Sequence, residues 1–201
     1  MKPQDPPPQL RALIIGASGG IGAAFVAALS NDKTYAEVIG LSRSQDGLDL
    51  TKEASIERLA DMQVGEFDLI ICATGALEID GQGPEKTIAR LSPATMAQQF
   101  QVNAIGPALI LKHFSPLLAQ ARRSVFAVLT ARVGSIDDNR LGGWISYRAA
   151  KAAANQILRT SAIEITRKRP QSIVVALHPG TVETKLAARQ ANHLRIGFVI
   201  G

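Results

Sequence analysis

A glycine-rich segment, Gly16 to Gly22 (GASGGIG), is the feature that most constrains the fold of this chain. It follows the apolar run 10–15, which is typical of a buried strand, and precedes 20–30, where apolar residues recur at helical spacing. In such a unit, backbone N–H groups at the helix start can hold a dinucleotide pyrophosphate, and glycines let it approach. We therefore interpret the segment as a cofactor-binding turn rather than a plain tight turn, although its spacing is G-x-x-x-G-x-G.

Strands and helices alternate along the rest of the chain. We expect strands at 10–15, 36–41, 67–73, 124–129 and 173–177, and helices at 20–30, 54–62, 93–119 and 145–167. Thr51 is expected to cap the second helix, and Pro107 to kink the third. This order predicts an α/β fold, a Rossmann-like doubly wound parallel sheet with helices on both faces. We expect one dinucleotide-binding domain over 10–201, after a flexible proline-rich arm at 1–9.

The residues after the second strand bear on the choice of cofactor. An enzyme that uses NAD usually places an acid there to accept from the ribose 2′-hydroxyl, whereas this chain has Ser42, Arg43 and Ser44. Arg43 could pair with a 2′-phosphate through two hydrogen bonds, although a surface arginine in a turn is the alternative. The sequence therefore favours NADP(H).

Tyr147 and Lys151 are four residues apart in a predicted helix, so they share one face. A nearby ammonium stabilises a phenolate and is expected to lower the tyrosine pKa toward the working range. The pair could then move a proton to or from a carbonyl oxygen. Such a spacing is common by chance, and it gains weight because a predicted dinucleotide turn precedes it.

Composition excludes several other classes. Cys72, the single cysteine, lies in an apolar run, which indicates a buried core thiol and a reducing, cytoplasmic setting. No apolar stretch is long enough to cross a membrane, and the arm at 1–9 has no secretory signal pattern. The net charge of +5 has no nucleic-acid motif beside it. The three histidines share no metal-ligand spacing, so we expect no metal.

Several ordered motifs together resemble the short-chain dehydrogenase/reductase family over nearly the whole chain. Its phosphate turn, TGxxxGIG, is matched at Gly16, Ser18, Gly19, Gly20, Ile21 and Gly22, with Ile15 in place of the threonine. Other matches imply further cofactor contacts, at Asp49 and Leu50 for the adenine, at Ala73, Thr74 and Gly75, and at Pro179, Gly180, Val182 and Thr184. Lys151 would also hold the nicotinamide ribose.

The resemblance also implies catalytic roles. Tyr147 and Lys151 match the family's YxxxK pair, and Asn103 matches the asparagine that holds a water in its proton relay. The segment 131–153 is similar to a branch containing C-factor-like proteins and sniffer-type carbonyl reductases.

The chain departs from the family pattern at the catalytic serine. Ala131 falls on the usual serine position, and Thr130 or Ser135 could supply a hydroxyl instead, with Ser135 slightly favoured. Loss of one donor to a developing oxyanion commonly lowers the rate about 10²-fold or more. We therefore expect weakened rather than absent activity.

The segment after PGTVETKL is a second departure, because the family's substrate lid and last strand are expected there and look truncated. A homodimer through the long helices 93–119 and 145–167 is compatible with that loss.

Two functions remain open. The first is an NADP(H)-dependent oxidoreductase acting on a small carbonyl or alcohol substrate, with neither a nucleic-acid nor a membrane partner. The second is a non-catalytic NADP(H)-binding signalling or redox-sensing protein of the same fold, which Ala131 and the short C-terminal segment favour.

Overall fold

The predicted apolar runs form the strands of one sheet in a computed structural model, which describes residues 9–180 and 197–199. The strands are β1 (Leu10–Ile15), β2 (Tyr35–Leu41), β3 (Leu69–Cys72), β4 (Ser124–Leu129), β5 (Ser172–His178) and β6 (Gly197–Val199). Their order within the described residues is β2-β1-β3-β4-β5-β6. The first five run parallel, and β6 pairs antiparallel with β5, a pairing that the sequence analysis did not predict.

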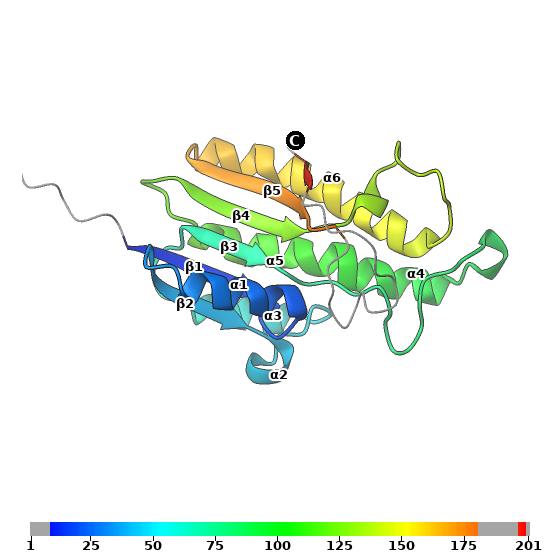
Figure 1. Ribbon diagram of the computed structural model, residues 1–201, viewed down its shortest axis with the longest axis horizontal. Coiled ribbons are helices and arrows are strands. Elements are labelled where there is room, and N and C mark those ends of the chain that lie inside the picture. Colours follow the sequence, from blue (N-terminus) through cyan, green and yellow to red (C-terminus); the bar gives the residue numbers. More distant parts are fainter. Residues whose placement is uncertain (1–8, 181–196, 200–201) are drawn as a thin grey trace, which may run out of the picture.

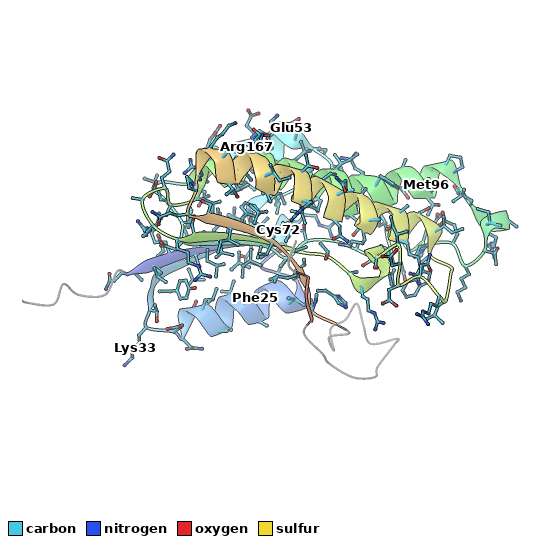
Figure 2. The ribbon with its side chains drawn as sticks, turned by 90° about the horizontal axis from the view of Figure 1, so that it is seen from above. Phe25, Lys33, Glu53, Cys72, Met96 and Arg167 are labelled. Atoms are coloured by element: carbon cyan, nitrogen blue, oxygen red, sulfur yellow. The ribbon has the colours of Figure 1, made fainter. Side chains whose placement is uncertain are left out.

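Helices cover both faces of this sheet. They are α1 (Gly20–Ser30), α2 (Arg43–Asp46), α3 (Glu53–Asp61), α4 (Pro93–Phe100), α5 (Gly106–Phe114) and α6 (Ile145–Lys168). Figure 2 shows α1, with Phe25, on one side of the sheet, and α3 and α6, with Glu53 and Arg167, on the other. The fold is therefore the doubly wound, Rossmann-like α/β arrangement that the alternation predicted.

Alternation along the strands divides the core into two layers. Leu13 and Ile15 of β1 lie in the larger apolar cluster, together with residues of α3, α5 and α6. Ile14, which lies between them in the sequence, belongs to a smaller cluster with Phe25 and Val26 of α1. All three β1 side chains are fully buried. The central strands are thus apolar on both faces, as a covered parallel sheet requires.

The region expected to form one kinked helix over 93–119 has a different local structure. A π-helical segment, Gln101–Ile105, joins α4 to α5, and a 3-10 turn, Ser115–Leu117, follows. Pro107 lies in the first turn of α5, directly after helical backbone, so its missing N–H interrupts the helical hydrogen bonding there. The π-helical segment therefore lies just before the proline and contains Asn103.

Two local expectations were wrong. Thr51 does not cap α3, because Lys52 takes the cap position without a side-chain cap bond and the Thr51 hydroxyl donates to Asp49. The segment after β2, expected as a turn, contains the short helix α2, which Gly47 ends in the left-handed conformation (φ 71°). Among the described residues, no helix is long and apolar enough to span a bilayer.

Candidate functional site

The parallel strands all end on the same side of the sheet (Figure 1), and the glycine-rich turn, Ser42, the motif 73–75 and Thr130 follow these carboxyl ends. The N–H groups of Gly16 and Ala17 donate to the Leu41 carbonyl at 2.8 and 3.0 Å, which joins the end of β1 to the end of β2. A Cβ atom on Gly16 would lie 2.7 Å from the Ala73 carbonyl oxygen, so the end of β3 is equally close. The turn therefore lies between the paired ends of β1 and β3, from which the chain continues to helices on opposite faces of the sheet (Figure 2), the usual place for a ligand in such sheets.

The geometry of the turn requires glycine and suits a pyrophosphate. Gly16 has a φ of +94°, and a Cβ atom on Gly22 would lie 2.2 Å from the Gly16 carbonyl oxygen. Gly19 precedes α1 with no side chain capping the helix, and Ser18, Gly19 and Gly20 are exposed. Open N–H groups at a helix start form an anion site, which Ile21 flanks within the first turn. The residues present fit a dinucleotide phosphate.

The end of β2 contains an acid that the sequence analysis missed. Ser42 is buried and Arg43 exposed, as a 2′-phosphate site would need. However, the Asp46 carboxylate accepts hydrogen bonds from the Ser42 N–H at 2.7 Å and from its hydroxyl at 3.3 Å. The expectation that no carboxylate stands near this position is therefore wrong. The capping-box pattern does not point to it, because that pattern places Glu or Gln three residues after the serine, where Gln45 stands, and Asp46 is four residues away.

The predicted adenine contacts lie beside this turn. The Asp49 carboxylate accepts from the N–H and hydroxyl of Thr51 and pairs with Lys52 at 3.3 Å. These hydrogen bonds, the one with the Thr51 side chain foremost, hold the pKa of Asp49 below its ordinary value. Leu50 packs against the start of α5, because a Cβ atom on Gly106 would lie only 2.9 Å from the Cβ atom of Leu50.

Tyr147 and Lys151 lie one turn apart near the start of α6, as predicted. The Lys151 Nζ lies 5.8 Å from the centre of the Tyr147 ring and donates to the Leu129 carbonyl at the end of β4, at 3.4 Å. Lys151 is only 3% exposed. The helix thus presents an ammonium group and a phenol together at the carboxyl end of the sheet.

Burial dominates the electrostatics of this pair. It raises the pKa of Tyr147 to about 12 and lowers the pKa of Lys151 to about 8, the latter opposed by the neighbouring Cys72. The expectation that Lys151 lowers the pKa of Tyr147 is therefore wrong for the protein chain alone, in which the pKa is raised. The physical reason is that removal of water disfavours both charged forms, while the ammonium faces the ring.

Asn103 is fully buried in the π-helical segment and is tied to the loop after β3. Its Oδ1 accepts from the Ala76 N–H at 3.0 Å, and its Nδ2 donates to the Ala76 carbonyl and to the Gln99 Oε1, both at 2.8 Å. Gln99, which the sequence analysis missed, donates to the Leu77 carbonyl at 2.9 Å. The side chain of Asn103 therefore shapes this loop. The predicted role in a water relay stays a prediction.

Gly75 lies between the side chains of Asn103 and Lys151. A Cβ atom there would lie 3.0 Å from both the Asn103 Oδ1 and the Lys151 Nζ, and its φ of +136° suits glycine. Beside it, the Thr74 hydroxyl contacts the Cys72 sulfur at 3.1 Å. The buried thiol expected at Cys72 is confirmed. The structure thus brings the motif 73–75 together with both Asn103 and Lys151.

The hydroxyl candidates are placed differently. Thr130 is buried directly after Leu129, whose carbonyl accepts from Lys151. The Ser135 hydroxyl accepts from the Asp138 N–H at 3.2 Å. Ser135 also lines a cavity of about 310 Å³ with Arg148 and other residues, among which neither Tyr147 nor Lys151 is found. Thr130 thus follows a residue that contacts Lys151, and Ser135 follows Gly134, where a Cβ atom would lie 3.0 Å from the Lys151 Cβ, so the choice between the two hydroxyls stays a prediction.

The remaining predicted contacts follow β5. Pro179 and Gly180 are half-buried at the carboxyl edge, and Gly180 has a φ of +73°. Nearby, His178 Nδ1 accepts from the Arg132 N–H at 3.2 Å. Val182 and Thr184 lie outside the described residues.

A family model described as enoyl-(acyl carrier protein) reductase matches residues 17–196. Among curated proteins, 1-hydroxy-2-glutathionyl-2-methyl-3-butene dehydrogenase of Rhodococcus sp. (strain AD45) is 29% identical over 189 residues, covering 87% of this chain and 78% of that one. C-signal of Myxococcus xanthus is 37% identical over 99 residues, covering 49% of this chain and 58% of that one. The chain thus matches under two thirds of the length of the second relative.

Solved structures share the fold. An NADPH-bound carbonyl reductase from chicken fatty liver superposes with a TM-score of 0.76 at 24% identity, covering 92% of this chain and 80% of that one. Carbonyl reductase Sniffer of D. melanogaster also gives a TM-score of 0.76, at 19% identity, covering 92% of this chain and 86% of that one. C-signal and Sniffer, which represent the two kinds of protein in the branch named from the sequence, are therefore among the proteins similar to this chain.

Proposed function

Because the chain belongs to the short-chain dehydrogenase/reductase family, we propose that it is an NADP(H)-dependent oxidoreductase that interconverts a carbonyl and a secondary alcohol. One observation carries the proposal. The buried Lys151 ammonium lies between the Tyr147 ring and the Gly75–Asn103 contact, at the same edge of the sheet as the glycine-rich turn. An acid–base pair and a dinucleotide cradle are therefore neighbours.

The bound cofactor would supply a hydride to the carbonyl carbon, or accept one in the reverse direction. Tyr147 donates its phenolic proton to the carbonyl oxygen in reduction and takes it back in oxidation. The Lys151 ammonium stabilises the resulting phenolate. Asn103 supports the relay that returns the proton. Thr130 or Ser135 donates to the substrate oxygen, with Thr130 supported by its place beside the carbonyl that Lys151 contacts.

The cofactor preference rests on Arg43, which is exposed beside the buried Ser42. Gly16, Ser18, Gly19, Gly20, Ile21 and Gly22 would hold the pyrophosphate, and Asp49 and Leu50 the adenine. The NADPH-bound carbonyl reductase of the same fold supports this choice. Lys151 and the residues after β3 and β5 would hold the nicotinamide end. A homodimer through α4, α5 and α6 and a cytoplasmic setting remain part of the proposal.

The second candidate is a cofactor-binding protein without turnover. Ala131 has no hydroxyl, and the Ser135 hydroxyl is already engaged by the Asp138 N–H. These two observations favour a sensor or signalling role.

Titration of NADPH and NADH by fluorescence, followed by NADPH oxidation over a carbonyl panel, separates the two candidates. We expect turnover by the wild type, its loss in Tyr147→Phe with binding kept, and no change in Tyr35→Phe, the same substitution at the other tyrosine. Thr130→Val and Ser135→Ala identify the hydroxyl donor. Tight NADPH binding with turnover no faster than Tyr147→Phe supports the sensor, and tighter binding of NADH contradicts the role of Arg43.

A further inference from the structure

The start of α6 lacks a cap of its own. The residue before it, Trp144, adopts the left-handed conformation (φ 54°, ψ 42°), and its side chain makes no cap hydrogen bond. Bulky residues rarely adopt this conformation, so surrounding contacts must hold it. The N–H groups of a first helical turn also need partners. For the N–H groups of Trp144 and Ser146, these partners come from a distant part of the chain.

Glu85, in the loop between β3 and α4, supplies them. Its carboxylate accepts from the Ser146 hydroxyl at 2.6 Å and from the Ser146 N–H at 3.2 Å. Its backbone carbonyl accepts from the Trp144 N–H at 2.6 Å. Lys86 is close as well, because its carbonyl oxygen lies 3.5 Å from where a Cβ atom on Gly143 would be. We call the contacts of Glu85 with Trp144 and Ser146 the loop–helix clamp.

The clamp is buried and charged. Glu85 is 8% exposed and Ser146 is fully buried. Burial alone would raise the pKa of the Glu85 carboxyl, but the hydrogen bonds from Ser146, together with those from the backbone N–H groups of Glu85 and Ser92, outweigh it and hold the pKa below its ordinary value. An ionised carboxylate at a helix start is also favoured by the helix dipole. A carboxylate is seldom kept in such a place unless its partners satisfy both oxygens, as they do here.

The clamp acts on the residues that flank Tyr147. Ser146 precedes it directly, and the Trp144 ring meets the Tyr147 ring edge to face, with centroids 6.3 Å apart and planes at 78°. Movement of the first turn of α6 would therefore displace the phenol. The far end of the same loop is held by Asn103 through Ala76.

We propose that Glu85 is a positioning residue for Tyr147: its carboxylate replaces the missing cap of α6 and fixes the angle at which the phenol meets the substrate. This role rests on the proposed oxidoreductase function. Glu85 acts on the phenol through its contacts with Ser146 and Trp144. Misplacement of a catalytic group by about 1 Å can slow a reaction about 10²-fold.

Steady-state kinetics and tryptophan fluorescence test the proposal together. In Glu85→Ala we expect kcat to fall about 10- to 100-fold, with the Kd for NADPH unchanged, because the glycine-rich turn is not disturbed. Glu85→Gln keeps one acceptor and should recover part of the loss. Ser146→Ala removes a single hydrogen bond and serves if Glu85→Ala does not fold. Glu53→Gln is the matched control, because Glu53 is an exposed acid of α3 that pairs with Lys112 of α5, and its kcat should equal that of the wild type.

Trp144 is the only tryptophan of the chain, so its emission reports on the clamp without any substrate. We expect a red shift and stronger quenching by acrylamide in Glu85→Ala but not in Glu53→Gln. A shifted emission with unchanged kcat overturns the positioning role and leaves a plain helix cap. Unchanged emission in both Glu85 variants overturns the clamp itself. A wild type that binds NADPH and turns nothing over refutes the oxidoreductase, and the clamp then stands or falls on the emission of Trp144 alone.

Discussion

At the scale of single residues, Lys151 places an ammonium group where little water reaches it. Burial lowers its pKa to about 8, against an ordinary value of 10.5, and raises the pKa of Tyr147 from 10.0 to about 12. The folded chain thus works against the charged form of both groups. The charge on Lys151 at neutral pH is a cost to the fold that the proposed chemistry requires.

The pH dependence of stability should reveal this cost. Between pH 8 and 10.5 the unfolded chain binds the Lys151 proton and the folded chain does not, so the free energy of unfolding rises with pH through this window. The full effect is about 3 kcal/mol. Lys151→Met should therefore be more stable than the wild type at neutral pH, and the difference should shrink toward pH 10.5. Urea unfolding of both proteins at several pH values measures it.

Tyr147 acts in the opposite direction and at higher pH. From pH 10.0 to about 12 the folded chain keeps a proton that the unfolded chain has lost, so its contribution to stability falls with rising pH. Tyr147→Phe should remove this fall and leave the pH dependence of stability between pH 8 and 10 unchanged.

For the Lys151 prediction, parallel curves of unfolding free energy against pH for the wild type and Lys151→Met would contradict the burial of the ammonium.

Asp46 bears on cofactor choice. Its carboxylate occupies the Ser42 N–H and hydroxyl, beside the proposed site of the 2′-phosphate. Removing a like charge near a phosphate should tighten NADPH binding about fivefold through roughly 1 kcal/mol of relieved repulsion. NADH has no such phosphate, so Asp46→Asn should leave its Kd nearly unchanged. Asp61→Asn, at the exposed end of α3, is the control, and equal changes for both cofactors would exclude this role for Asp46.

At the scale of elements, local patterns predicted most of the framework. The bounds of β1, α1 and β4 agree with the prediction, because each is an apolar or helical run with clear ends. Tyr147 and Lys151 were found because helical spacing is a local property. The π-helical segment was not found, since Pro107 indicates an irregularity but not its form or place.

Contacts between distant residues could not be predicted in this way. Glu85 and Ser146 are 61 residues apart, and no sequence period links them. The dominance of burial over charge at Tyr147 also depends on how the elements pack, which a helical spacing does not contain. Asp46 is only four residues from Ser42, but the capping box has a spacing of three, so this contact too depends on the folded form of α2.

Close packing of α1 against the end of β1 depends on Gly22 in the glycine-rich turn. A Cβ atom on Gly22 would lie 2.2 Å from the Gly16 carbonyl oxygen, so α1 would have to move away from the end of β1. Overpacking of this kind costs about 1–3 kcal/mol. We expect Gly22→Ala to lower stability and weaken NADPH binding at least tenfold, by about 1.4 kcal/mol or more. Thermal unfolding and fluorescence titration measure both effects.

Gly83→Ala is the matched control for this substitution. Nothing lies within 4 Å of a Cβ atom at Gly83, in the loop after β3, so the same change should alter neither quantity. Equal affinity in Gly22→Ala and the wild type would show that the turn does not hold the pyrophosphate.

At the scale of the whole molecule, the two ends of the parallel strands, which we call the carboxyl edge and the opposite edge, differ in function. The carboxyl edge carries the glycine-rich turn, Lys151 and the start of α6 (Figure 1). The opposite edge carries an ionic network around Asp68, just before β3. Asp68 accepts from the Arg11 N–H of β1 at 2.9 Å and from two guanidinium nitrogens of Arg122, which precedes β4. This network joins three strands where no site residue was predicted.

Asp68→Asn should therefore separate stability from function. Asp68 is 6% exposed, and the amide cannot accept all the hydrogen bonds that the carboxylate receives. We expect a loss of about 2 kcal/mol, below the range for fully buried pairs because Arg122 is partly exposed. The melting temperature should fall, while the Kd for NADPH and the emission of Trp144 stay at the wild-type values. Glu66→Gln, in a looser and more exposed pair with the same arginine, should cost less than about 1 kcal/mol. A changed Kd in Asp68→Asn would mean that the two edges are coupled through the strands, and the division between stability and chemistry would then fail.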